Sequence, residues 1–233
     1  MNLPRAILID LDDTILDDGG STESCWTDAC AAAEAEHGFE RGRLKAAIKE
    51  YASVWWSDDS RHRRGRLDLR AATTEIVTEA LIRLGHGTAT AGAIANHYRD
   101  LREERVVLFD GALDTLAWLR ERGVGLGMMT NGAGPAQRAK IERFKLAEHF
   151  AHIVIEGEFG AGKPQRAVYE TLLRELDVSP ADTWAIGDNL RWDVYPPMEM
   201  GMHGIWVDPA DRGVPVDWWE PDRIVRTLSD LRG

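Results

Sequence analysis

The sequence predicts an α/β fold: a parallel sheet with helices on both faces and a large helical insert. Two observations support this prediction. Short apolar segments alternate with amphipathic segments along much of the 233 residues, which is typical of a parallel α/β sheet. Between residues 21 and 108 the strand pattern stops, and the helix-forming residues Ala, Glu, Leu and Arg dominate. We therefore expect a core of residues 1–20 and 109–233, interrupted by a helical domain of residues 21–108.

Each core element is expected from its own stretch of sequence. Residues 6–11 form a short apolar run that ends in acidic residues, as in a strand buried on both faces. Two aspartates and two glycines at 17–20 then indicate a turn. Beyond the insert, apolar runs predict strands at 124–129, 152–155, 184–186 and 204–207, and amphipathic runs predict helices at 113–120, 135–144 and 166–176.

The charge of the chain limits the choice of partners. There are 28 Lys and Arg against 39 Asp and Glu, a net charge of −11, and almost all of the excess lies outside the helical insert. An acidic surface repels phosphate backbones and anionic lipids. We therefore expect neither nucleic acid nor a membrane as a partner. A monomer or a homodimer is compatible with the sequence.

The cysteines and the N-terminus indicate the cellular compartment. Cys25 and Cys30 are the only cysteines, too few for a disulfide framework or a zinc site. Residues 1–5 leave no room for the apolar part of a signal peptide, and no apolar run approaches the ~18 residues of a membrane span. We expect a cytoplasmic protein with two reduced thiols.

Two pairs of acidic residues follow predicted strands. Asp10 and Asp12 point to the same side of an extended chain, at the carboxyl edge where open α/β sheets bind ligands. Taken alone, this pair is also typical of a solvated acidic loop. Asp188 and Asp193 follow a later strand and bring a second pair to the same edge. Clustered carboxylates are costly without a cation, and oxygen ligands favour a hard divalent ion such as Mg²⁺.

Two other strands end in residues suited to phosphate. Residues 130–132, Thr-Asn-Gly, place a hydroxyl and backbone N–H groups at a strand-to-helix junction, where they could hold phosphate oxygens. Residues 157–164, GEFGAGKP, are close to a P-loop, but Pro164 stands where that motif needs a Ser or Thr hydroxyl for magnesium. This excludes a nucleotide-binding P-loop and leaves Lys163 as a cation at the sheet edge.

With these motifs the sequence resembles the haloacid dehalogenase-like (HAD) hydrolase superfamily. The resemblance covers almost the whole chain and rests on Asp10-Leu11-Asp12-Asp13-Thr14, Thr130-Asn131-Gly132, Lys163-Pro164, and Gly187-Asp188 with Asp193. It implies a Rossmann-like core with strand order 5-4-1-2-3, and the helical insert resembles the type 1 cap of that superfamily. It also implies a Mg²⁺-dependent phosphatase that acts on a small phosphorylated metabolite.

The resemblance assigns roles to the matching residues. Asp10 would attack phosphorus and form an aspartyl-phosphate, and Asp12 would act as the acid and base. Phosphoryl oxygens would be held by Lys163 together with Thr130, Asn131 and Gly132. Mg²⁺ would be bound by the Asp10 carboxylate, the Asp12 carbonyl oxygen, Asp188 and, directly or through water, Asp193.

The superfamily also includes other reactions, which make different demands on these residues. The dehalogenase branch replaces the second carboxylate of the first motif and needs no metal, so Asp12 and Asp188 favour phosphoryl chemistry. A phosphonate hydrolase would need a cap lysine, and Lys45 and Lys49 are more simply solvated helix residues. A sugar phosphomutase keeps the same core residues and is the alternative among enzymes. A non-catalytic binding protein of the same fold has no need of a nucleophile beside an acid.

The densest cationic run lies in the insert, at residues 61–66. Arg63 and Arg64 would grip a second anionic group of the substrate. The alternative is a solvated interhelical loop whose arginines pair with Asp58 and Asp59.

Overall fold

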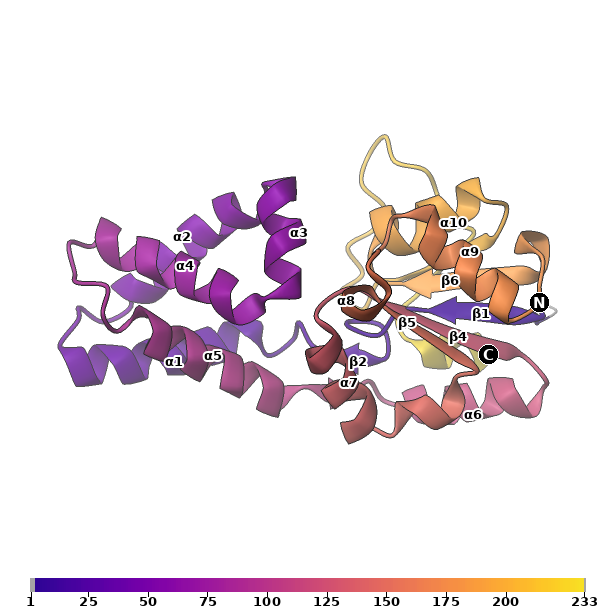
Figure 1. Cartoon of the computed structure of the whole chain (residues 1–233), viewed down its shortest axis with the longest axis horizontal. Coiled ribbons are helices and arrows are strands. Elements are labelled where there is room, and N and C mark those ends of the chain that lie inside the picture. The colour runs from indigo at the N-terminus through magenta and orange to yellow at the C-terminus, as the bar shows by residue number, and fades with distance from the viewer. Residues whose placement is uncertain (1–2, 233) are drawn as a thin grey trace. The chain divides into compact units, whose positions relative to one another are not determined.

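The computed structural model describes residues 3–232 and divides the chain into two compact units (Figure 1). The core unit consists of Met1–Asp17 and Val107–Gly233, and the cap unit consists of Asp18–Val106. The change of composition in the sequence predicts boundaries after residues 20 and 108. No helix within residues 3–232 has the length and apolar character needed to cross a membrane.

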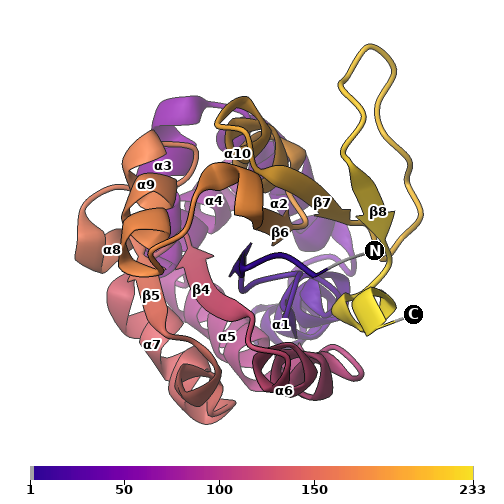
Figure 2. The ribbon, with the colours of Figure 1, turned by 90° about the vertical axis from the view of Figure 1, so that its right-hand side faces the viewer.

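The core unit is built on one sheet of six parallel strands (Figure 2). The strand order is β5–β4–β1–β6–β7–β8, with the bounds β1 Ala6–Ile9, β4 Gly125–Thr130, β5 His152–Ile155, β6 Thr183–Gly187, β7 His203–Val207 and β8 Arg223–Val225. Without β8, the strands β1, β4, β5, β6 and β7 can be numbered 1 to 5 in chain order. Read from β7 across the sheet, their order is then the predicted 5-4-1-2-3, which confirms the fold class. β8 extends one edge and was not predicted, because a run of three residues carries little periodicity.

β1 lies at the centre of this sheet because its side chains tolerate burial on both faces. Residues Ala6–Ile9 are fully buried. They pair with β4 on one side and β6 on the other, and Ala6 lies beside Gly125 and Thr183. Since the strands are parallel, their carboxyl ends meet at one edge of the sheet, where Asp10 follows β1.

Helices cover both faces of the sheet. α6 (Ala112–Glu121) and α7 (Gly134–Arg143) lie on one face, and α9 (Arg166–Glu175) and α10 (Tyr195–Glu199) lie on the other (Figures 1 and 2). α9 packs an apolar stripe that includes Tyr169 and Leu172 against side chains of β1, β4 and β6. The remaining helical segments of the core are η1 Leu146–His149, α8 Glu156–Phe159, η2 Pro180–Asp182, η3 Leu190–Val194 and η4 Leu228–Arg232.

A second, two-stranded sheet lies where the chain leaves and re-enters the core unit. β2 (Leu16–Asp17) pairs antiparallel with β3 (Val107–Leu108). The turn before β2 contains Asp13 with φ of 59°, a left-handed conformation that Asp tolerates better than most residues. The sequence predicts only a turn near this point, because strands of two residues show no alternation.

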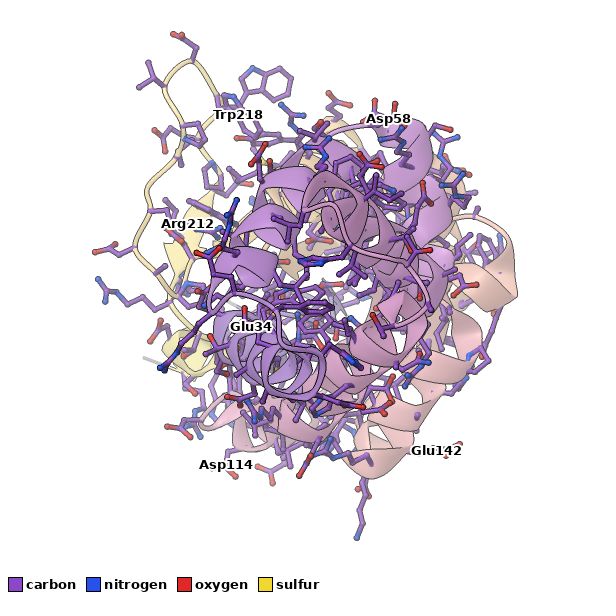
Figure 3. The ribbon with its side chains drawn as sticks, turned by 90° about the vertical axis from the view of Figure 1, so that its left-hand side faces the viewer. Glu34, Asp58, Asp114, Glu142, Arg212 and Trp218 are labelled. Atoms are coloured by element: carbon purple, nitrogen blue, oxygen red, sulfur yellow. The ribbon has the colours of Figure 1, made fainter. Side chains whose placement is uncertain are left out.

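The cap unit is helical, as the composition of the insert predicts. Its helices are α1 Thr22–His37, α2 Arg43–Trp56, α3 Asp59–Leu67, α4 Leu69–Arg83 and α5 Ala91–Arg105. The cationic run at 61–66 lies within α3, so the alternative of an interhelical loop was wrong. The physical reason is Asp58, labelled in Figure 3, whose carboxylate accepts the Arg61 amide N–H and caps the first turn of this helix.

Candidate active site

Asp10, directly after β1, lies against Lys163 and Asp193 inside the core unit. Oδ1 of Asp10 is 2.5 Å from Nζ of Lys163, and Oδ1 of Asp193 is 2.6 Å from the same nitrogen. All three residues are buried. Burial by itself lowers the pKa of Lys163, but attraction to the two carboxylates outweighs this effect and the pKa is raised. Lys163 is therefore a fixed positive charge beside Asp10.

Asp188, which follows β6, completes an acidic cluster. Asp10, Asp188 and Asp193 each offer an oxygen, and these oxygens lie within 4.8 Å of one another. Burial, followed by repulsion from Asp193, raises the pKa of Asp188 to about 7. Burial also raises the pKa of Asp10; Lys163 opposes this rise, and the other two carboxylates add to it. One ammonium cannot neutralise three carboxylates, so these hard oxygen donors fit a divalent cation such as Mg²⁺.

Asp193 is positioned by the turn after β6. Its Oδ2 accepts the amide N–H of Asn189 at 3.0 Å, while its Oδ1 meets Lys163. The carboxylate packs onto Gly187, where an added Cβ would lie 2.4 Å from Cβ and Cγ of Asp193. Glycine at 187 is thus required by the close approach of Asp193, which gives a physical reason for the Gly-Asp motif at this strand end.

Asp12 is held by two residues of α7 that the sequence analysis did not single out. Its Oδ1 is 2.7 Å from Nζ of Lys140, and its Oδ2 accepts from Nε2 of Gln137 at 2.8 Å. The same Gln137 nitrogen is 2.6 Å from Oγ1 of Thr130. Gln137 thereby joins Asp12 to Thr130. The sequence signal for this pair was its spacing: Gln137 and Lys140 are three residues apart on the helix that follows Thr130, so they share one helix face.

The chain after β4 is tied to the chain around Lys163. The Asn131 side chain donates to the Lys163 carbonyl oxygen at 3.0 Å and accepts the Lys163 amide N–H at 2.8 Å. The N–H of Gly132 donates to Oε2 of Glu156 at 3.0 Å, a buried acid that the sequence analysis also missed. Asn131 thus positions Lys163. Phosphoryl binding by Thr130, Asn131 and Gly132 remains a prediction.

The cap arginines expected at the substrate are exposed. Arg64 pairs with Glu75 at 2.8 Å, whereas Asp58, the alternative partner, caps α3. Arg63 is also exposed, and neither arginine lines the pocket of the cap unit formed by α1, α2, α4 and α5. Substrate binding by Arg63 and Arg64 remains a prediction.

The chain matches known proteins over nearly its whole length. A family model described as haloacid dehalogenase-like hydrolase matches residues 4–195, and a second, HAD-hydrolase-like model matches residues 160–231. A phosphoserine phosphatase of Thermus thermophilus is 30% identical over 88% of this chain and 88% of its own length. A glyceraldehyde 3-phosphate phosphatase of Pyrococcus abyssi is 32% identical over 50% of this chain and 48% of its own length.

A solved structure shares the fold. The HAD-hydrolase YfnB from Bacillus subtilis, bound to magnesium, is similar with a TM-score of 0.73 and 24% identity, covering 99% of this chain and 97% of that chain. The family model also spans Asp10, Thr130, Lys163 and Asp188. The chain belongs to the haloacid dehalogenase-like hydrolase family.

Proposed function

We propose that the protein is a Mg²⁺-dependent phosphatase that hydrolyses a small phosphomonoester through an aspartyl-phosphate. The pair of carboxylates after β1 carries the proposal: Asp10 is buried beside Lys163, and Asp12 is oriented by Gln137 and Lys140. This chemistry needs a nucleophile and a separate acid–base group. A dehalogenase of this family has no such second carboxylate, so Asp12 supports phosphoryl transfer.

The reaction would proceed in two steps. An oxygen of Asp10 would attack phosphorus while the bond from phosphorus to the leaving oxygen breaks and Asp12 donates its proton to that oxygen. Water would then attack the phosphorus of the aspartyl-phosphate, Asp12 would take a proton from this water, and the bond to Asp10 would break to release phosphate. Lys163, at 2.5 Å from Asp10, would offset the charge in both steps.

The acidic cluster supports a Mg²⁺ site. Asp10, Asp188 and the carbonyl oxygen of Asp12 would be ligands, with Asp193 bound directly or through water. When bound, Mg²⁺ would neutralise part of the charge on the phosphoryl group and the carboxylates. The raised pKa values of Asp10 and Asp188 support this site, since burial and mutual repulsion disfavour both carboxylates until a cation compensates them.

A small phosphorylated metabolite is the substrate class that the relatives support. Phosphoserine and glyceraldehyde 3-phosphate, named in two of them, are both small phosphomonoesters. The two substrates differ in charge and functional groups, so the similarity supports the ester class and no individual compound.

The test is phosphate release from p-nitrophenyl phosphate and a panel of small phosphomonoesters, with Mg²⁺ or with EDTA. We expect Mg²⁺-dependent release that Asp10→Asn lowers by about a thousandfold or more. Asp12→Asn should lower kcat by about a hundredfold or more. Asp114→Asn, which removes an exposed carboxylate on α6 (Figure 3), is the matched control and should keep full activity.

Two results would contradict the proposal. One is a folded, Mg²⁺-binding protein that releases no phosphate from any of these compounds. The other is an Asp10→Asn variant as active as the wild type. Transfer of the phosphoryl group within a sugar phosphate, without release, would identify a mutase instead.

A further inference from the structure

The cap unit contains a pocket of its own, of about 400 Å³, between α1, α2, α4 and α5. Three cations and two carboxylates lie on its wall, next to aromatic and aliphatic side chains. None of the residues assigned to the phosphoryl site lines this pocket. Pockets with a mostly apolar wall and a few polar groups are typical of small-molecule sites.

Most of the charge in this pocket is already paired. Asp18 Oδ2 lies 2.6 Å from Nη2 of Arg102, and Glu23 lies 2.9 Å from Nζ of Lys49 and 2.5 Å from Nζ of Lys45, which does not line the pocket. Each carboxylate of the wall thus has a cation of the wall as its partner. The third cation, Arg99, has no carboxylate of the wall as an ion-pair partner. With three cations and two carboxylates, the lining residues carry a net charge of one positive unit.

Within residues 3–232, Arg99 forms no hydrogen bond or ion pair; its Cζ lies 6.0 Å from the Tyr98 ring centroid, and the charges of Asp18 and Glu103 attract it. Its Nε is buried and lacks an acceptor, and the same is true of Nε of Arg102, one turn further along α5. Burial and repulsion from Arg102 also lower the pKa of Arg99. The Nη atoms of Arg102 already donate to Thr22, Tyr98 and Asp18, so Arg99 is the guanidinium of the wall that favours a bound anion.

The rest of the wall suits an organic group. Trp26 stacks on Tyr98 with ring centroids 3.6 Å apart and an interplanar angle of 9°. Trp56, from the end of α2, also lines the pocket. These flat surfaces can contact the apolar body of a ligand whose charged end meets Arg99.

We propose that the cap pocket binds a small organic monocarboxylate, with its carboxylate on the guanidinium of Arg99 and its apolar part against Trp26 and Trp56. A guanidinium pairs well with a planar carboxylate because two N–H groups match two oxygens. A single unpaired cation matches a monoanion, whereas Asp18 and Glu23 on the same wall disfavour a dianion such as phosphate. This binding does not depend on the phosphatase reaction.

The test is calorimetric titration of the full chain with acetate, butanoate and benzoate, with benzamide as the neutral analogue of benzoate. We expect saturable 1:1 binding of at least one carboxylate, which benzamide does not reproduce. Arg99→Met should weaken this binding at least tenfold, and Arg99→Lys should weaken it less. Arg83→Met is the matched control, because Arg83 lies outside the pocket, where it pairs with Glu79 and stacks over Tyr51, and it should bind as the wild type does.

Several outcomes would overturn the proposal: no carboxylate binds up to 10 mM, benzamide binds as well as benzoate, or a folded Arg99→Met variant binds as tightly as the wild type. If Arg99→Met does not fold, Arg99→Lys and the benzamide comparison decide the question. The source of the carboxylate is tested separately by inhibition of p-nitrophenyl phosphate hydrolysis. Competitive inhibition would assign the pocket to a carboxylate of the substrate, and saturable binding without competition would assign it to a separate effector.

Discussion

The ammonium nitrogen of Lys140 lies 2.7 Å from Oδ1 of Asp12, although the two residues are 128 positions apart in the chain. The other carboxylate oxygen accepts from Gln137. Both partners belong to α7, so a residue three positions after β1 is oriented by the helix that follows β4. An acid–base group that must reach the leaving oxygen depends on such orientation, because proton transfer requires hydrogen-bond distance.

Replacing Lys140 by Met should lower kcat for aryl phosphate by about tenfold while KM changes little, because Asp12 loses one of its two orienting contacts. Lys140→Arg keeps a cation at the carboxylate and should recover part of the loss. Lys145→Met, at an exposed position just after the same helix, is the matched control. Unchanged kcat in a folded Lys140→Met variant would show that this contact does not serve catalysis.

Gly187→Ala should destabilise the core unit by about 1–3 kcal/mol, because the new methyl group would overlap the Asp193 side chain. Displacement of Asp193 would also disturb Lys163, so activity should fall as well. Gly92→Ala on α5 is the control: nothing lies within 4 Å of its added Cβ, and it should be neutral or stabilising by up to about 1 kcal/mol. Thermal unfolding and phosphate release measure both effects, and equal melting temperatures for the two variants would contradict this account.

The metal-free protein should become less stable as pH rises toward about 7. Burial and Asp193 raise the pKa of Asp188 from its usual 3.8 to about 7, so the folded state holds a proton that the unfolded chain releases. The resulting stabilisation is complete below pH 3.8 and is lost as pH rises through about 7. In EDTA we expect Tm to fall between pH 5 and pH 8, and we expect Asp188→Asn to reduce this slope.

Two comparisons complete that experiment. Asp114→Asn, an exposed carboxylate with no part in the cluster, should leave the slope unchanged. Adding Mg²⁺ at pH 8 should restore stability, because binding to the charged carboxylates favours the folded state. A wild-type Tm that rises over this pH range in EDTA would show that Asp188 does not hold a proton in the metal-free fold.

The thiol of Cys30 should be almost unreactive in the native protein. Burial, followed by repulsion from Glu34 (Figure 3), raises the pKa of Cys30 to about 12, so very little thiolate forms at pH 8. Alkylation by iodoacetamide, with peptide mapping, should modify Cys30 at least about a hundredfold more slowly in native protein than in urea. Rapid modification of Cys30 without denaturant would contradict its buried position on α1.

Much of the core could be predicted because a parallel sheet leaves a regular pattern in the sequence. Strands buried on both faces need apolar runs, and their carboxyl ends carry the polar residues, so Asp10, Thr130 and Asp188 were found at strand ends. Short elements such as β8 escaped prediction because three residues show no periodicity. An interhelical loop at residues 61–66 was a wrong prediction, because Asp58 caps a helix that contains the whole cationic run.

The sequence by itself determined which residue types end the strands and that the insert is helical, since both follow from local patterns of apolar and polar residues. Tertiary structure decided which side chains meet. Gln137 and Lys140 at Asp12, Glu156 at Gly132, and the unpaired Arg99 in the cap are known only from packing. The hydrogen-bond partners of buried groups depend on how the helices pack on the sheet and on one another. A local sequence pattern does not predict this packing.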